Sequence, residues 1–368
     1  MKKKNLCKTL LKTMCILLGI LILALLAYIV YLYASYYRIE DNQELVVEAP
    51  VDDTTTGAAA VLATDTEYSA VTYNIGFGAY LPDYSFFMDG GTSSWAESPE
   101  TVQYAINGAG ELVKSLDPDF ALIQEIDLDA TRSYHTDEYE MLRNILPEYT
   151  TVFAQNYDSA FLFYPFTQPH GSSRAGLGLF SKYPVSSALR RSFPISTSFS
   201  KFFDLDRCYS VSRIPVDNGK ELVIFNLHMS AYGNSDKIRK GQIEMLCNDM
   251  AKEYEAGNYV LCGGDFNHDL KASEEDAESC ESWAFPFPRS ELPEHFTFCL
   301  DLLTEEEQAA LWNSARNADM EYVPGVTYTV TLDGFIISDN IECLSYENVN
   351  TGYSYSDHDP VKVEFVLK

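Results

Sequence analysis

The sequence predicts an α/β domain, because short apolar strands alternate with amphipathic helices and polar residues gather where the strands end. Helices are expected over residues 101–116, before Asp117 and Pro118, and over a stretch that ends at Gly257. Polar residues at strand ends are typical of a sheet-based active site. Strands are expected over residues 69–73, 120–123, 222–227, 259–262, 332–337 and 361–367.

An uncharged apolar stretch over residues 14–34 precedes this domain and is long enough, as a helix, to cross a bilayer. The lysine-rich tail, residues 1–13, places the N-terminus in the cytoplasm by the positive-inside rule. A cleaved signal peptide is the alternative, but its apolar region is shorter, roughly 7 to 15 residues. We therefore expect a single-pass protein of the cell membrane, with an acidic stalk over residues 35–66 and one extracytoplasmic domain over residues 67–368.

Composition limits the partners of this domain. The 368 residues are 46% hydrophobic, which is enough for a deep core, and the formal net charge is -28. A field of that sign repels nucleic-acid backbones, so tight DNA binding is disfavoured, although the acidity can also serve solubility alone. The eight cysteines include no CxxC or CxxxC pair. That spacing argues against a thiolate zinc site and leaves one or two disulfides open.

The segment GGDFNHD places Asp265 and Asn267 two residues apart. In an extended chain both side chains would face the same side. Gly263 and Gly264 are expected to let the backbone turn tightly or approach a ligand closely. The alternative is an Asx turn that closes a strand.

The segment SDHDP places Asp357 and His358 directly before the last expected strand. A histidine can take a proton from water near neutral pH when a carboxylate holds its ring, and Asp333 in TLDGFIIS is the candidate for that role. Metal binding is the other use of such side chains. Because adjacent side chains diverge, we expect Asp357 and His358 to serve different tasks.

Three further polar residues follow apolar strands: Asn74, Glu125 and His228. A carboxylate at the depth of Glu125 is costly unless it is paired or bound to a cation, and Mg²⁺ is its natural partner. His228 and Asn74 each have an ordinary structural alternative, a buried core histidine and a turn asparagine.

The joint order of these residues, Asn, Glu, His, Asp-x-Asn, Asp and Asp-His, resembles the endonuclease/exonuclease/phosphatase superfamily. The likeness covers residues 71–367 and depends on GDFN and SDHDP in combination. It implies a four-layer α/β sandwich of two mixed β-sheets with outer helices and a cleft at one edge. The sequence is most similar to the DNase I-like and neutral sphingomyelinase-like branch, since Gly76 and His228 depart from the abasic-site nucleases.

The resemblance also implies a metal centre. Glu125 would bind the catalytic cation with help from Asn74 and Asp357. Mg²⁺ is the expected cation, and Mn²⁺ is the alternative.

For the reaction itself, the resemblance implies that His358, held by Asp333, is the general base or a donor to the transition state. Asp265 and Asn267 would position the nucleophile and the phosphate. His228 would protonate the leaving oxygen or stabilise the pentacoordinate state.

The function expected from these features is a membrane-anchored, divalent-metal-dependent phosphoester hydrolase that acts on lipid head groups or small phosphoesters outside the cytoplasm. The aromatic segments 80–87 and 161–166 are candidates for a bilayer interface or a pocket lining, with ordinary packing as the alternative. An extracellular nuclease and a non-catalytic binding ectodomain are the other hypotheses.

Overall fold

The computed structural model describes residues 2–52, 61–202, 204–230, 236–273 and 283–368. They fall into two units, Met1–Arg38 and Ile39–Lys368. The first unit consists of helix α1 (Lys2–Ser35), which includes most of the expected basic tail. Within the described ranges, this is the one helix long and apolar enough to cross a membrane, which makes it a candidate anchor or signal sequence.

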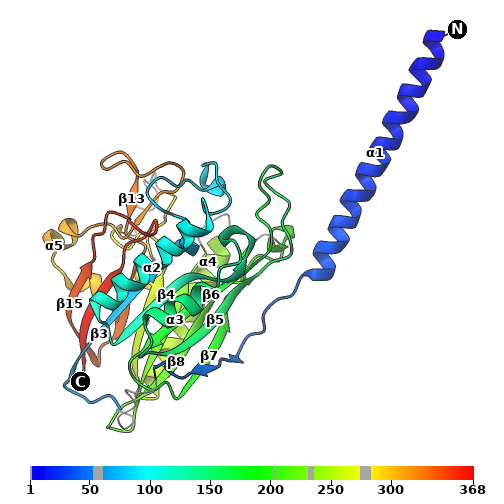
Figure 1. Cartoon of the computed structure of the whole chain (residues 1–368). Helices are drawn as coiled ribbons and strands as arrows, with labels where there is room; N and C mark the ends of the chain where they lie inside the picture. The colour runs from blue at the N-terminus through cyan, green and yellow to red at the C-terminus, as the bar shows by residue number, and fades with distance from the viewer. Residues whose placement is uncertain (1, 53–60, 203, 231–235, 274–282) are drawn as a thin grey trace. The chain divides into compact units, whose positions relative to one another are not determined.

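The second unit is built on two mixed β-sheets, each of seven strands within the described residues (Figure 1). The first sheet has the order β1 (Gln43–Glu44), β7 (Ser187–Ser192), β8 (Cys208–Pro215), β9 (Glu221–His228), β10 (Tyr259–Asp265), β14 (Asp333–Ser338) and β11 (Phe296–Phe298). The second has the order β15 (Ile341–Asn348), β16 (Val361–Leu367), β3 (Glu67–Asn74), β4 (Phe120–Ala130), β6 (Ser173–Ser181), β5 (Thr150–Asp158) and β2 (Val47–Glu48). The neighbours β9 and β10, and likewise β3 and β4, run parallel.

Helices complete the layers. Helices α2 (Pro99–Leu116) and α3 (Glu138–Ile145) pack on the second sheet, and α4 (Asp236–Glu255) packs on the first. A short helix, α5 (Glu305–Ala310), and a small ribbon of β12 (Ala315–Arg316) and β13 (Thr329–Val330) belong to the connections. The four-layer α/β sandwich that the sequence predicted is confirmed.

Strand β4 shows how alternation produces these layers. Phe120 and Leu122 point into the core shared by the two sheets, whereas Ala121 and Ile123 point into the core beneath α2. All four side chains are fully buried. A strand that is apolar on both faces therefore marks a sheet covered on both sides.

Helix α2 follows the sequence signals at both ends. Ser98 caps it, since its hydroxyl accepts the N–H of Thr101 at 3.1 Å, and Pro99 fills the first turn. The helix ends at Asp117, whose φ of 47° is left-handed, directly before Pro118. The start lies slightly before the expected residue 101 because the cap and the proline extend the first turn.

Part of the segment expected as a stalk belongs to the sheets. Strand β1 pairs with β7, and β2 pairs with β5, so the two short strands form edges of both sheets. The compact unit accordingly begins at Ile39, before the expected boundary at residue 67. Edge strands pair through backbone N–H and C=O groups. The acidic side chains of this segment therefore do not reveal the pairing.

The cysteines that the structure describes are free thiols, so no disulfide forms among them. Cys280 lies outside the described residues.

The pairing of the strands brings the predicted site residues together. Asp265, at the end of β10, stands opposite His228 of β9 and opposite Asp333 of β14. In the second sheet, Asn74 ends β3 and Glu125 lies in its parallel neighbour β4. A hydrogen bond from Asn74 to Asp265 joins the two sheets, so the polar ends of four strands and Glu125 meet at one edge.

Candidate active site

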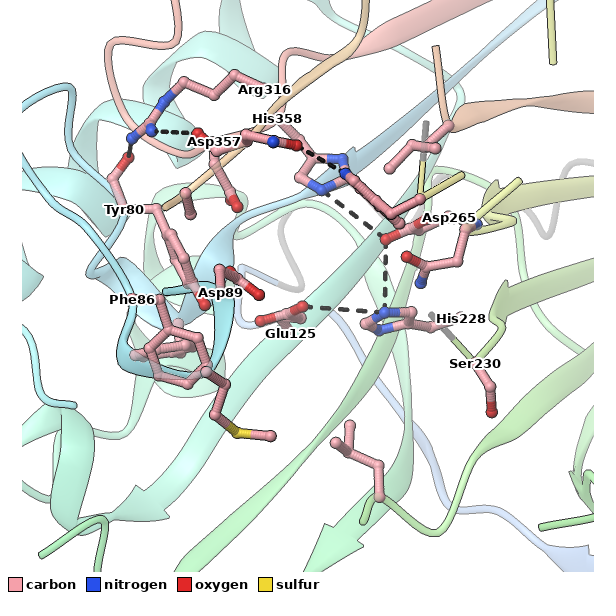
Figure 2. Close-up of a pocket in the computed structure, with 18 of the residues that line it drawn as sticks. Tyr80, Phe86, Asp89, Glu125, His228, Ser230, Asp265, Arg316, Asp357 and His358 are labelled. Carbon is pink, nitrogen blue, oxygen red and sulfur yellow. Dashed lines mark hydrogen bonds and ion pairs between the residues drawn. The ribbon is translucent and has the colours of Figure 1, made fainter. Parts of the chain in front are cut away.

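A cavity of about 520 Å³ opens where these strands end. Asn74 and Asp333 lie behind its wall and reach it through hydrogen bonds. Figure 2 shows Glu125, His228, Asp265 and His358 linked in a row across the cavity. Six of the eight predicted site residues line it directly: Glu125, His228, Asp265, Asn267, Asp357 and His358.

His358 and Asp333 form a buried pair, with His358 Nδ1 2.7 Å from Asp333 Oδ2. Ser314 Oγ donates to the same carboxylate oxygen at 2.8 Å. Because Asp333 holds Nδ1, the other ring nitrogen, Nε2, faces Asp265 Oδ2 at 3.9 Å. Burial lowers the pKa of His358, but the charge of Asp333 and its hydrogen bond outweigh burial and hold that pKa well above its ordinary value. The ring is therefore an imidazolium near neutral pH.

Asp265 is the centre of the row. Its Oδ2 accepts a hydrogen bond from Asn74 Nδ2 at 3.0 Å and lies 3.4 Å from His228 Nε2. Burial raises the pKa of Asp265 to about 7, although the charge of His358 and the hydrogen bonds from Asn267 and Asn74 oppose the increase. A carboxyl group with a pKa near neutrality is suited to exchange protons with water.

Asn267 does not continue an extended chain. Its φ of 51° is left-handed, and its backbone N–H donates to Asp265 Oδ1 at 2.8 Å, which is an Asx turn. The side chain still lines the cavity, while its Nδ2 donates to the carbonyl of Met229 at 2.8 Å. The expectation of an extended chain at Asn267 was therefore wrong. The Asx turn itself places this side chain in the cavity wall.

Gly263 and Gly264 lie inside β10 and form no turn. A Cβ on Gly264 would lie 2.1 Å from the carbonyl oxygen of Leu227, and one on Gly263 would lie 2.4 Å from the ring of Phe335. The two glycines therefore allow close approach of protein neighbours.

Glu125 and Asp357, the carboxylates expected to bind the cation, both line the cavity. Glu125 lies at a bulge in β4 with a left-handed φ of 58°, and its side chain is 23% exposed. Burial raises the pKa of Asp357, and the charge of Glu125 adds to this increase while His358 and Arg316 oppose it. Two partly desolvated carboxylates that repel each other in one cavity are a donor set that fits Mg²⁺ or Mn²⁺.

Asn74 connects this pair of carboxylates to the first sheet. Its Nδ2 donates to Glu125 Oε1 at 3.2 Å as well as to Asp265, and its Oδ1 accepts the N–H of Gly76 at 3.0 Å. The amide thereby orients two carboxylates. Its place among the metal ligands stays a prediction.

His228 has different surroundings from His358. Its Nε2 lies 3.9 Å from Glu125 Oε1, while its buried Nδ1 has no hydrogen-bond partner among the described residues. Burial lowers the pKa of His228 well below its ordinary value, and the charges of Arg207 and His358 add to this decrease. His228 is therefore a neutral imidazole near pH 7.

Three buried arginines line the cavity, and the sequence analysis did not identify them: Arg132, Arg207 and Arg316. A single arginine next to a strand or a turn is not part of any recognisable sequence motif. The excess of acidic residues in the chain also hides a local group of cations.

The two aromatic segments differ. In residues 80–87, Tyr80 and Phe86 are buried and pack on Phe77 with ring centroids 5.2 and 6.3 Å away. In residues 161–166, by contrast, several rings are exposed, and that of Phe166 is 84% exposed. Ordinary core packing therefore explains most of the segment 80–87 but not the segment 161–166.

The model of the Endonuclease/Exonuclease/phosphatase family matches residues 71–300. No curated protein matches the chain in sequence. Among solved structures, an endonuclease/exonuclease/phosphatase from Beutenbergia cavernae DSM 12333 is similar with a TM-score of 0.56 and 14% identity, covering 82% of this chain and 72% of that one.

Two further structures have the same fold. ANGEL2, a 2',3'-cyclic phosphatase in complex with adenosine-2',3'-vanadate, gives a TM-score of 0.55 at 13% identity, over 82% of this chain and 96% of that one. The human Nocturnin catalytic domain with bound sulfate gives 0.53 at 17% identity, over 82% and 95%. At such identities these structures show the fold alone. The family match extends over more than half of the chain, and the chain therefore belongs to the endonuclease/exonuclease/phosphatase family.

Proposed function

We propose that this chain is a membrane-anchored, divalent-metal-dependent phosphoester hydrolase that acts on lipid head groups or small phosphoesters outside the cytoplasm. The observation that carries the proposal is the hydrogen-bonded pair of His358 and Asp333, whose imidazole faces Asp265 in the cavity that Glu125 and Asp357 also line. Phosphoester hydrolysis needs ligands for a cation, a group that accepts a proton from water, and donors to the phosphoryl oxygens.

The chain's residues divide these tasks. Glu125 and Asp357 would hold the cation, which when bound neutralises charge on the phosphoryl oxygens. Asp265 accepts the proton of the attacking water as the new oxygen–phosphorus bond forms. The imidazolium of His358 donates from Nε2 to a phosphoryl oxygen. His228, as a neutral ring, donates a hydrogen bond to the leaving oxygen as its bond to phosphorus breaks, and solvent supplies the final proton.

Two features support a substrate at a membrane. Helix α1 is apolar over a length that suits a bilayer. Close to the cavity, the exposed rings of Phe163, Tyr164 and Phe166 form an aromatic surface. Tyr164 lies 5.8 Å from the ring of Phe87, whose neighbour Phe86 lines the cavity. Exposed aromatic rings of this kind partition into the interfacial region of a bilayer.

An extracellular nuclease is the second candidate. The similarity in fold to ANGEL2, which was solved with an adenosine-2',3'-vanadate ligand, favours a nucleotide substrate. The net charge of -28 opposes tight binding of long nucleic acids. A binding ectodomain without catalysis is disfavoured, because the charged residues proposed for hydrolysis gather in the cavity or, like Asp333, directly behind its wall.

The test is hydrolysis by the full-length protein in detergent micelles with Mg²⁺. Sphingomyelin, phosphoinositides, inositol phosphates, bis-p-nitrophenyl phosphate and plasmid DNA are compared, with Glu125→Ala and His358→Ala as inactive controls. We expect metal-dependent hydrolysis with a preference for lipid or small phosphoesters. Preferred cleavage of plasmid DNA would favour the nuclease, and no metal-dependent hydrolysis of any substrate would refute the enzyme.

A further inference from the structure

Arg207 is a buried guanidinium that has no counter-charge among the described residues. It lies directly before β8, lines the cavity and is 6% exposed. Within the part of the chain that the structure describes, its buried Nε and Nη1 have no hydrogen-bond partner, and no carboxylate forms an ion pair with it. A buried charge left unpaired destabilises the fold. The protein without a bound ligand therefore gains no stability from this arrangement.

The other two arginines of the cavity differ from Arg207. Arg132 donates from Nε and Nη2 to the carboxylate of Asp127 at 3.1 and 2.8 Å and stacks on Phe77. Arg316 donates to three backbone carbonyls and leaves only Nε without a partner. Their donors are already used by the protein. Arg207 alone among the three has its donors available.

The position of Arg207 identifies what would complete it. It contributes positive charge at His228, whose Nε2 lies 3.4 Å from Asp265, and it lines the same cavity as both residues. Asp204 lines the cavity in the same segment, and its Oδ1 accepts the N–H of Leu205 at 2.9 Å. A guanidinium offers parallel N–H groups that match two oxygens of a phosphate.

We propose that Arg207 binds phosphate oxygens of the substrate on the His228 side of the cavity and so selects for substrates that present negative charge there. This inference rests on the proposed function and names a further residue of the same site. The bound phosphate would supply the counter-charge that the described residues do not provide. Arg207 would thus set substrate affinity, while the cation and the row of Asp265 and His358 act on the reacting atoms.

Thermal unfolding of the full-length protein in detergent micelles tests the inference with inorganic phosphate as the probe. EDTA is present throughout, so that phosphate cannot bind through a cation. We expect phosphate far above its Kd to raise the Tm of the wild type by about 3–5 °C. Arg207→Met should lose this rise. Without phosphate, its Tm should equal or exceed that of the wild type, because an unpaired buried charge has been removed.

Arg213→Met is the matched control, since Arg213 is paired with Glu221 and Glu253 away from the cavity. It should keep the full phosphate-dependent rise, and Arg207→Lys should keep part of it. A Tm of Arg207→Met that falls well below the wild type without phosphate would show a structural role and overturn the inference. An unchanged phosphate-dependent rise in Arg207→Met would overturn it as well.

Kinetics give an independent measurement. With bis-p-nitrophenyl phosphate, Arg207→Met should raise KM by about 10- to 100-fold, as loss of hydrogen bonds to a charged group predicts, with a smaller change in kcat. An active variant with an unchanged KM would refute the inference and leave the proposed function intact. If the wild type hydrolyses nothing but its phosphate-dependent Tm rise requires Arg207, the proposed function fails and the anion site stands.

Discussion

Two of the histidines that line the cavity, His228 and His358, lie in opposite electrostatic surroundings. His358 is held by Asp333 at 2.7 Å and has a raised pKa. The Nδ1 of His228 has no partner in the described ranges, and burial and the charge of Arg207 lower the pKa of that ring. Burial lowers the pKa of both rings. The neighbours therefore decide the charge of a buried histidine, and one cavity presents a cationic ring and a neutral ring a few ångströms from the same carboxylate, Asp265.

Removing the cation should have the largest effect on hydrolysis. It leaves the negative charges of Glu125 and Asp357 without the cation's counter-charge in the cavity that His228 and His358 share. We expect EDTA to abolish hydrolysis and Mg²⁺ to restore it. In Glu125→Gln, the Mg²⁺ concentration for half-maximal activity should rise by at least about 10-fold, since a ligand charge is lost. Glu347→Gln, at an exposed position, is the control. Full activity in EDTA would contradict the metal assignment.

Loss of the cationic ring should come next. His358→Gln should lower kcat by about 10³-fold, and Asp333→Asn should have a comparable effect because it removes the charge that holds the proton. Since the two residues act as a unit, the double variant should be little worse than either single variant, as measured by steady-state hydrolysis. Undiminished activity in His358→Gln would disprove its role.

Loss of the neutral ring should cost less. His228→Ala should lower kcat by about 10²-fold, the usual cost of one hydrogen-bond donor to developing charge. Parallel kcat measurements on both histidine variants test the ranking. An effect as large as that of His358→Gln would mean that the two rings contribute equally, and the contrast in their charge would lose its functional meaning.

A third histidine sharpens the comparison through stability. Burial lowers the pKa of His268 from 6.5 to about 4, although its ring is hydrogen-bonded to the carbonyl of Phe266 at 2.6 Å. Between those pH values the unfolded chain binds a proton that the folded chain does not, so stability should be lost as pH falls from about 6.5 to about 4. His268→Gln should flatten the slope of the unfolding free energy in this window, measured by denaturant titrations. An unchanged slope would contradict the neutral ring.

The strands and the residues at their ends could be predicted, because periodicity and apolar runs depend on local sequence. The predicted strand that ends before His228 and the one that ends before Asp265 are both present, and their parallel register brings the two residues together. The pairing of His358 with Asp333 follows from the same logic, since Asp333 begins β14 and His358 lies shortly before β16 of the other sheet.

Features that depend on distant parts of the chain could not be predicted. The role proposed for Arg207 depends on its lack of a partner among the described residues, which only the packed structure reveals. The turn at Asn267 depends on a hydrogen bond that competes with extended backbone. Strands β1 and β2 depend on free edges of two sheets that form far away in sequence. Each of these features depends on tertiary contacts, which override or add to what the local sequence favours.

Glu125 carries a consequence for the evolution of the fold. Its left-handed φ of 58°, within a strand, is a conformation that glycine adopts freely and that costs a residue with a side chain about 1–2 kcal/mol. Selection for thermal stability alone would therefore drive this position toward glycine and remove the carboxylate. A homologue with glycine here would be a more robust scaffold that lacks the proposed cation ligand. A search for non-glycine residues with left-handed backbone inside strands offers a way to find candidate sites in chains that carry no recognisable motif.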